Sequence, residues 1–162
     1  MRIVKDKIEI RDIKFYMGLA ALEARKSECK KSRRGVIIVN SGNIIGKGHN
    51  KVTLEKLCNP CIRKDIRSGN RVELCSALHA EQMAIMDKSG SLKGSRMYHI
   101  ALENGKIVYS GSPCCTVCSR MIYESGISEF VLLHKEGYTI YNTKEFNELS
   151  FDYVLKKYNK NS

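Results

Sequence analysis

The chain has 162 residues, of which 43% are hydrophobic, and it carries 28 Lys and Arg against 17 Asp and Glu. This size predicts one compact domain over residues 1–162, and no apolar run approaches the roughly 18 residues of a membrane span. The N-terminal segment lacks the long apolar stretch of a secretory signal, so we expect a cytoplasmic protein with no membrane partner. The net charge of +11 favours an anionic partner, either a phosphorylated small molecule or a nucleic acid.

The first part of the chain is predicted to be a helix followed by a hairpin and a long loop. Apolar residues recur at helical spacing from residue 12 to about 30, with Asp12 as the predicted cap. Residues 50–74 show no period, although three cysteines lie in or just after them, and this segment is predicted to be a long ordered loop.

Five short apolar runs have the length and composition of strands. The turns at SGN (41–43) and ENGK (103–106) each join two of them into a hairpin. The runs are residues 35–40, 44–48, 96–102, 107–110 and 128–133. Because these strands alternate with helices and include two hairpins, we predict an α/β fold: a three-layer α/β/α sandwich with a central mixed sheet of about five strands.

Three further helices are predicted from apolar periodicity and from residues typical of helix ends. One starts near Ala77 and is apolar on nearly all sides after its first turn. Another spans CCTVCSRMIYESG (114–126), with Gly126 just past its end. Apolar residues at helical spacing near the C-terminus predict one or two terminal helices that cover the sheet.

Two helix starts carry residues that suit a metal ion. His79 and Glu81 open the first of these helices, although burying ionisable groups costs several kcal/mol unless something compensates them. Cys115 and Cys118 open the second, where free N–H groups and the helix dipole favour thiolates. One imidazole and two thiolates leave the fourth position of a tetrahedral zinc ion open, as a catalytic site requires.

The open position predicts a hydrolytic reaction. Zinc lowers the pKa of a bound water from about 15.7 to about 7, so hydroxide is available at neutral pH. Glu81 lies two residues from His79 on the same turn, where it can move protons without ligating the ion. We therefore predict His79, Cys115 and Cys118 as metal ligands and Glu81 as the catalytic residue.

HAE (79–81) and SPCCTVC (112–118) resemble the H-x-E and P-C-x-x-C signature of zinc-dependent base deaminases. Residues 27–50 and 118–132 are also similar to the corresponding segments of deoxycytidylate deaminases, so the resemblance covers most of residues 27–132. It implies the cytidine deaminase-like fold and hydrolytic deamination at C4 of a cytosine ring, with conversion of dCMP to dUMP and ammonia as the expected reaction. It also implies a homo-oligomer.

The resemblance further implies that Asn50 contacts the sugar and that Arg33, Arg34 or Lys51 meets a 5′-phosphate. At the second motif the chain departs from the family, which places Pro directly before the first ligand cysteine. Here Pro113 precedes Cys114. Cys114 is therefore an alternative to Cys115, because residues at i and i+4 also share a helix face.

Four cysteines remain outside this set: Cys29, Cys58, Cys61 and Cys75. Four thiolates would close a second, structural zinc site that ties the long loop to the first helix. The alternative interpretation is that Cys29 and Cys75 are buried apolar residues. The other histidines have no such neighbours in the sequence and are interpreted as structural or surface residues; they are His49, His99 and His134.

Two other functions compete with dCMP deamination. The first is deamination of a base in tRNA or DNA, or of another nucleobase or nucleoside such as cytidine or guanine. The second is a zinc-stabilised nucleic-acid-binding module without chemistry, which Glu81 argues against because a structural site gains nothing from a carboxylate beside an open position. Aromatic residues make up 7% of the chain and Trp is absent, so a nucleic-acid partner is not favoured.

Overall fold

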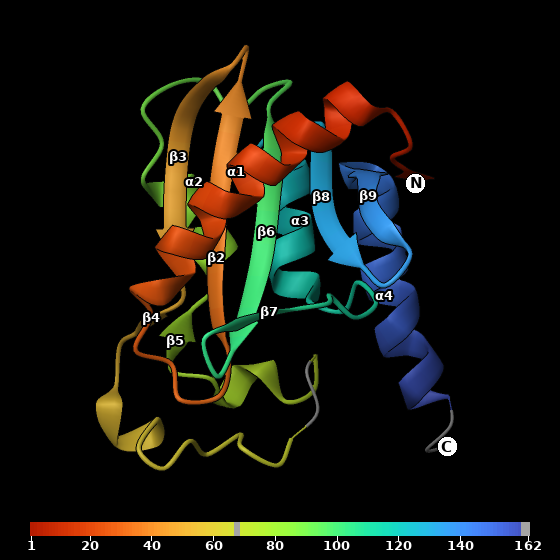
Figure 1. Cartoon of the computed structure of the whole chain (residues 1–162). Helices are drawn as coiled ribbons and strands as arrows, with labels where there is room; N and C mark the ends of the chain where they lie inside the picture. The colour runs from red at the N-terminus through yellow and green to blue at the C-terminus, as the bar shows by residue number, and fades with distance from the viewer. Residues whose placement is uncertain (67–68, 160–162) are drawn as a thin grey trace.

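The computed structural model describes residues 1–66 and 69–159, and a mixed sheet of seven strands forms its middle layer (Figure 1). Its strands are β1 (Arg2–Ile3), β2 (Arg33–Asn40), β3 (Asn43–His49), β6 (Arg96–Glu103), β7 (Lys106–Val108), β8 (Glu129–His134) and β9 (Gly137–Asn142). Hydrogen-bonded neighbours follow the order β1-β9-β8-β6-β2-β3, and β7 pairs with β6. β6 and β8 are parallel and the other pairs are antiparallel, which confirms the predicted mixed sheet.

Helices cover both faces of this sheet. α1 (Lys7–Arg25) crosses one face, whereas α2 (Ala80–Met86), α3 (Thr116–Glu124) and α4 (Thr143–Tyr158) lie on the other (Figure 1). The three-layer α/β/α sandwich is therefore confirmed. None of the helices in the described part of the chain has both the length and the apolar character that crossing a membrane requires.

The two predicted hairpins are present. Both central residues of each turn have positive φ, at 48° and 79° for Ser41 and Gly42 and at 51° and 75° for Asn104 and Gly105. Tight turns of this kind match the right-handed twist of the strands that they join. The β2–β3 and β6–β7 pairs follow from this local chemistry.

Helix α1 begins and ends earlier than predicted. Its cap is Asp6, whose Oδ1 accepts the N–H of Glu9 at 2.8 Å, and the helix ends at Arg25. The predicted cap, Asp12, lies inside the helix and is exposed. The prediction was wrong because most residues of the first turns face solvent, so the apolar period becomes visible only further along the helix.

The long loop before α2 has short ordered elements. β4 (Lys51–Val52) pairs with β5 (Ala77–Leu78), and single 3-10 turns form at Glu55–Leu57 and Val72–Leu74. Because residues 77–78 are paired as a strand, α2 starts at Ala80 and not near Ala77 as predicted. His79 is thus the residue that caps the helix.

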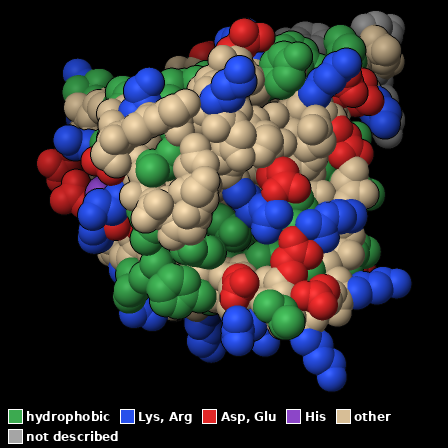
Figure 2. Space-filling model, turned by 90° about the horizontal axis from the view of Figure 1, so that it is seen from above, with side chains coloured by type: hydrophobic (Ala, Val, Ile, Leu, Met, Phe, Trp, Pro, Cys, Tyr) green, Lys and Arg blue, Asp and Glu red, His purple; other side chains and the backbone are tan. Residues whose placement is uncertain are grey.

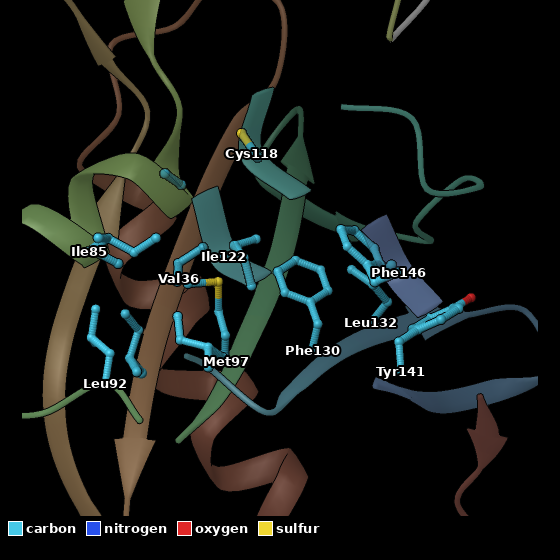
Figure 3. Close-up of a cluster of buried hydrophobic side chains, with 14 residues drawn as sticks. Val36, Ile85, Leu92, Met97, Cys118, Ile122, Phe130, Leu132, Tyr141 and Phe146 are labelled. Atoms are coloured by element: carbon cyan, nitrogen blue, oxygen red, sulfur yellow. The ribbon is translucent and has the colours of Figure 1, made fainter. Parts of the chain in front are cut away.

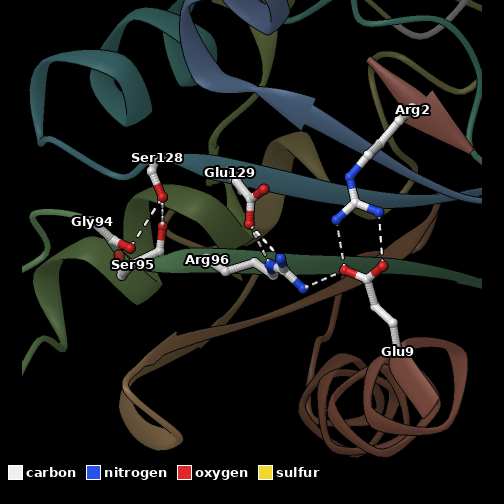
Figure 4. Close-up of polar contacts among 7 residues, drawn as sticks. All are labelled: Arg2, Glu9, Gly94, Ser95, Arg96, Ser128 and Glu129. Carbon is white, nitrogen blue, oxygen red and sulfur yellow. Dashed lines mark hydrogen bonds and ion pairs between the residues drawn. The ribbon is translucent and has the colours of Figure 1, made fainter. Parts of the chain in front are cut away.

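Two strands that sequence patterns missed extend the sheet at one edge. β9 forms a hairpin with β8, and β1 pairs with β9. An ion-pair network holds the N-terminal segment there (Figure 4): Glu9 accepts two hydrogen bonds of 2.7 Å from Arg2, and Arg96 contacts Glu9 at 3.3 Å and Glu129 at 2.6 Å. The network joins α1 and three strands.

A hydrophobic core lies between the sheet and helices α2 to α4 and holds these helices in place. It includes Val36, Met97, Ile122, Phe130 and Phe146, and the rings of Phe130 and Phe146 lie 4.3 Å apart. Figure 3 shows Cys118 at one end of this cluster, on the first turn of α3. The core therefore fixes the helix that presents this thiol.

The face that is turned away from the long loop has a mixed charge. Figure 2 shows Lys and Arg side chains around this face with Asp and Glu side chains between them. Such alternation gives no strong field of one sign over this side of the molecule.

Candidate metal centre and active site

The imidazole of His79 meets the thiols of Cys115 and Cys118 at the first turns of two helices. His79 caps α2 and Cys115 caps α3. The Nδ1 atom of His79 lies 3.1 Å from Sγ of Cys118 and 3.4 Å from Sγ of Cys115. All three donor atoms lie within 4.8 Å of one another, and residues 1–66 and 69–159 hold no second group of this kind.

These distances fit one bound zinc ion. With Zn–N bonds of about 2.0 Å and Zn–S bonds of about 2.3 Å, a tetrahedral ion separates nitrogen and sulfur ligands by about 3.5 Å. The His79–Cys115 and His79–Cys118 separations of 3.4 and 3.1 Å are close to this value. A nitrogen and two sulfurs are donors that zinc prefers, and three of them leave one position for water or substrate.

The two cysteines share their protons unequally. The hydrogen bond from Cys118 lowers the pKa of Cys115 to about 5, with a further contribution from His79, although burial opposes the shift. The same pair interaction and burial raise the pKa of Cys118 well above its usual value. One thiolate is thus available at neutral pH before any metal binds, and thiolate is the form that ligates metal ions.

Glu81 is buried beside this cluster, in the first turn of α2. Burial tends to raise the pKa of its carboxyl group, but the imidazoles of His99 and His79, its own backbone N–H and the charge of Arg34 together hold the pKa below its usual value. The carboxylate is therefore ionised at neutral pH and able to accept a proton.

A cavity of about 340 Å³ connects these groups. Its wall includes His79, Glu81 and Cys115 from the metal cluster and its surroundings. The loop that follows β7 forms another part of the wall, and two hydrogen bonds tie this loop to β8: the N–H of Ser110 donates to Leu133 O at 2.8 Å, and Nδ1 of His134 lies 2.9 Å from Ser110 O. This volume is sufficient for a small ligand.

Cys114 lies in the same cavity wall but outside the three-residue cluster. A Cβ atom built on Gly69 would lie 2.9 Å from Sγ of Cys114, so this thiol packs against the long loop. Of the two neighbouring cysteines, Cys115 is the one that the fold brings to His79 and Cys118.

The four remaining cysteines all line the cavity, namely Cys29, Cys58, Cys61 and Cys75. The backbones of Cys58 and Cys61 pair in an isolated antiparallel β-bridge. A hydrogen bond with His79 lowers the pKa of the Cys75 thiol to about 7. The four thiols do not form a compact ligand cluster among the described residues. The second zinc stays a prediction.

Asn50, the predicted sugar contact, lies in the cavity wall and is buried. Its side chain is already engaged, since Oδ1 accepts the N–H of Arg34 at 2.8 Å and Nδ2 donates to Ser32 O at 2.9 Å. Of the cations predicted near a phosphate, Arg34 lines this cavity. Arg33 lines a separate basic hollow, and Lys51 is exposed on β4.

Two residues of the cavity wall were missed or misread from the sequence. The sequence analysis interpreted His99 as a structural or surface residue. In the structure it is buried in the cavity wall, and its Nε2 atom lies 4.0 Å from Oε1 of Glu81. Its position on β6 between Met97 and Ala101 is the signal that was available, because alternate strand residues share a face. Arg63 lies in the aperiodic loop, where no local pattern indicates which side chains turn inward.

A mixed sheet with one histidine and two cysteines at the starts of two helices defines a metal-binding α/β/α domain. The chain belongs to the family described as "Cytidine and deoxycytidylate deaminase zinc-binding region", whose model matches residues 10–134. It therefore contains the zinc-binding region of that family, as the resemblance of the two motifs indicated.

Individual relatives agree with this assignment. The chain is 30% identical over 122 residues to the deoxycytidylate deaminase of Schizosaccharomyces pombe. This alignment covers 72% of this chain and 35% of the yeast protein. The chain is 26% identical over 129 residues to the deoxycytidylate deaminase of Mycobacterium phage D29. This alignment covers 72% of this chain and 90% of the phage protein. The chain thus spans about a third of the length of the fungal relative and most of the phage protein.

A solved structure of similar fold is the apo form of the dCMP deaminase from the cyanophage S-TIM5. It superposes with a TM-score of 0.50 at 26% identity, over 78% of this chain and 82% of that one. The cytidine deaminase-like fold that the resemblance implied is confirmed.

Proposed function

We propose that this chain is a zinc-dependent hydrolytic deaminase of a cytosine-type base and that dCMP is its substrate. One observation carries the proposal: His79, Cys115 and Cys118 converge from two separate motifs beside the buried carboxylate of Glu81, within a cavity large enough for a small ligand. The family match and the names of the relatives support the reaction class. A single domain over residues 1–162 would hold the whole site.

In this proposal the ion is held by Nδ1 of His79 and by the sulfurs of Cys115 and Cys118. When bound, zinc supplies an activated water molecule as the nucleophile at neutral pH. The carboxylate of Glu81 takes the proton from the attacking water, delivers a proton to N3 of the ring, and later protonates the departing amine. Burial of Glu81 excludes bulk water from these proton transfers.

A nucleotide is preferred over a nucleoside because cations converge on the cavity. Lys31, Arg34 and Arg63 all contribute to its wall. Arg63 is 8% exposed, and one of its terminal N–H groups donates to Asn70 O at 2.7 Å, whereas its Nε atom has no hydrogen-bond partner among the described residues. A buried N–H group without an acceptor costs free energy, and a 5′-phosphate would supply an acceptor for Nε of Arg63.

We further propose a homo-oligomer in which the outer face of α1 packs against a second copy. Ile8, Phe15 and Leu22 are each more than half exposed and lie seven residues apart, so they form one apolar stripe along this helix. Sedimentation of the wild type and of Phe15→Lys tests the idea. We expect the substitution to lower the oligomer mass, and an unchanged mass would contradict this interface.

The substrate proposal is tested by ammonia release from dCMP, deoxycytidine, cytidine, guanine and a tRNA pool, assayed side by side with zinc-loaded protein. We expect kcat/KM for dCMP to exceed that for the other substrates. Preference for guanine or for tRNA would replace dCMP with that substrate and keep the deaminase class. Tight binding of tRNA without ammonia release from any substrate would favour the nucleic-acid-binding module.

A further inference from the structure

His99 occupies the middle of the central strand β6. Its side chain lies on the face of the sheet that helices α2 and α3 cover. β2 and β8 flank this strand on its two sides, and Val36 of β2 lies opposite His99. The ring stacks on Phe130 with centroids 5.9 Å apart and an interplanar angle of 29°. Backbone pairing and stacking therefore hold the imidazole in one place.

The two ring nitrogens have different surroundings. Nε2 lies 4.0 Å from Oε1 of Glu81, whereas Nδ1 is buried and has no hydrogen-bond partner among the described residues. A buried N–H without an acceptor costs more than an unused lone pair. The proton of the neutral ring therefore belongs on Nε2, which faces the carboxylate.

Charged groups near His99 do not make it a cation at neutral pH. Burial lowers its pKa to about 4, and Arg34 on β2 and His79 before α2 act in the same direction, while Glu81 on α2 opposes them. The imidazole is thus a neutral donor. It can orient the carboxylate without adding a full positive charge beside it.

We propose that His99 is a positioning residue that directs Glu81 through a hydrogen bond from Nε2–H to one carboxylate oxygen, leaving the other oxygen to face the reacting base. The separation of 4.0 Å exceeds a hydrogen bond by about 1 Å, a distance that rotation of the Glu81 side chain covers. This inference rests on the proposed role of Glu81 as proton carrier.

The kinetic test compares two substitutions of His99. His99→Leu removes the donor, and we expect kcat for dCMP to fall by about 10- to 100-fold with KM changed less than about threefold, because the carboxylate is misplaced rather than lost. His99→Gln keeps an N–H donor of similar reach and is expected to recover most of kcat. Tyr98→Phe, on the opposite face of the same strand, is the matched control and should keep wild-type kinetics.

Zinc content and the melting temperature are measured on each variant, so that loss of the fold is not read as loss of positioning. Equal kcat for His99→Leu and wild type would overturn the proposal. So would a loss that appears only in KM, or a loss of equal size in His99→Leu and His99→Gln.

A second measurement does not depend on turnover. Proton–nitrogen NMR of the zinc-loaded protein labelled on histidine should show the Nε2–H tautomer for His99, and its Nε2 signal should shift in Glu81→Gln. An Nδ1–H tautomer, or an Nε2 signal with the same chemical shift in the wild type and in Glu81→Gln, would overturn the positioning role. If His99 has the Nε2–H tautomer but no substrate releases ammonia, the proposed deaminase function is wrong, whereas the hydrogen bond from His99 to Glu81 is supported.

Discussion

The Sγ atom of Cys118 lies 3.1 Å from Nδ1 of His79, although 38 residues of chain separate the two. Each side chain stands at the first turn of its own helix, and the common core beneath α2 and α3 sets the distance between the helices. Replacement of His79, Cys115 or Cys118 is therefore expected to affect the proposed metal binding before it affects the fold.

Removing the first thiol of the cluster is expected to remove the metal. Cys115→Ser replaces a thiolate by a hydroxyl that remains protonated at neutral pH, so this variant should lose tightly bound zinc, whereas Cys114→Ser should keep it. Zinc per chain, measured by elemental analysis after dialysis, checks this. Retention by Cys115→Ser together with loss by Cys114→Ser would reverse the ligand assignment.

The same measurement counts the ions. If Cys29, Cys58, Cys61 and Cys75 bind a structural zinc, the wild type holds two ions per chain and Cys58→Ser holds one. A wild-type ratio of one, unchanged in Cys58→Ser, would leave these thiols as ordinary residues of the cavity wall.

Neutralising Glu81 should stop the reaction and spare the metal. Glu81→Gln keeps the size of the side chain but cannot accept and pass on a proton, so kcat for dCMP should fall by a factor on the order of 10² to 10⁴. Zinc per chain should stay at the wild-type level, because Glu81 lies outside the cluster of His79, Cys115 and Cys118. Wild-type turnover by Glu81→Gln would assign the proton transfers to another group.

Arg63 is expected to select for the phosphate. Arg63→Gln should raise KM for dCMP by about 10- to 100-fold, since hydrogen bonds to a charged group contribute about 1.5–3 kcal/mol. Its KM for deoxycytidine should change less than about twofold. Lys64→Gln removes an exposed cation from the neighbouring position and is the control. Equal losses for nucleotide and nucleoside would show that Arg63 only supports the loop.

Gly48 permits the close contact between β3 and α2. A Cβ atom there would lie 2.4 Å from the backbone nitrogen of Ala84 and 2.5 Å from Ala80 O, so Gly48→Ala must displace the helix that carries Glu81. We expect a loss of about 1–3 kcal/mol of unfolding free energy, measured by urea titration, and reduced kcat. Gly18→Ala is the control, because nothing lies within 4 Å of its Cβ position and alanine favours helix α1.

The N-terminal ion-pair network predicts a pH dependence of stability. The hydrogen bonds from Arg2, with a further contribution from Arg96, lower the pKa of Glu9 below its usual 4.5, although burial opposes the shift. A carboxyl group whose pKa is lower in the folded state stabilises the fold above about pH 4.5 and loses that contribution as the pH falls through the folded-state pKa.

Replacing Glu9 by glutamine is therefore expected to lower the unfolding free energy by up to about 1 kcal/mol at pH 7 and to flatten its decline below pH 4.5. Urea titrations of wild type and Glu9→Gln between pH 3 and 7 measure both effects. Parallel curves for the two proteins would show that Glu9 does not contribute to the acid dependence.

Short-range chemistry in the sequence determined much of the fold and the centre of the site. The turns at Ser41–Gly42 and Asn104–Gly105 could be predicted because positive φ at two successive positions suits few residue types. The convergence of His79, Cys115 and Cys118 could be predicted because His79 with Glu81 and Cys115 with Cys118 each form a pattern within one helical turn. Such features need only a few neighbouring residues to become visible.

Only the tertiary structure decided which side chains complete the cavity. His99 stands alone in a strand, and its relation to Glu81 exists because α2 packs on β2 and β3, and β6 is the neighbour of β2 in the sheet. Arg63 turns inward from a loop without any period, and β1 gains its strand partner at residues 139–140, more than 130 positions along the chain. These contacts arise from packing between distant segments, and no local pattern of hydrophobicity or turn residues records them.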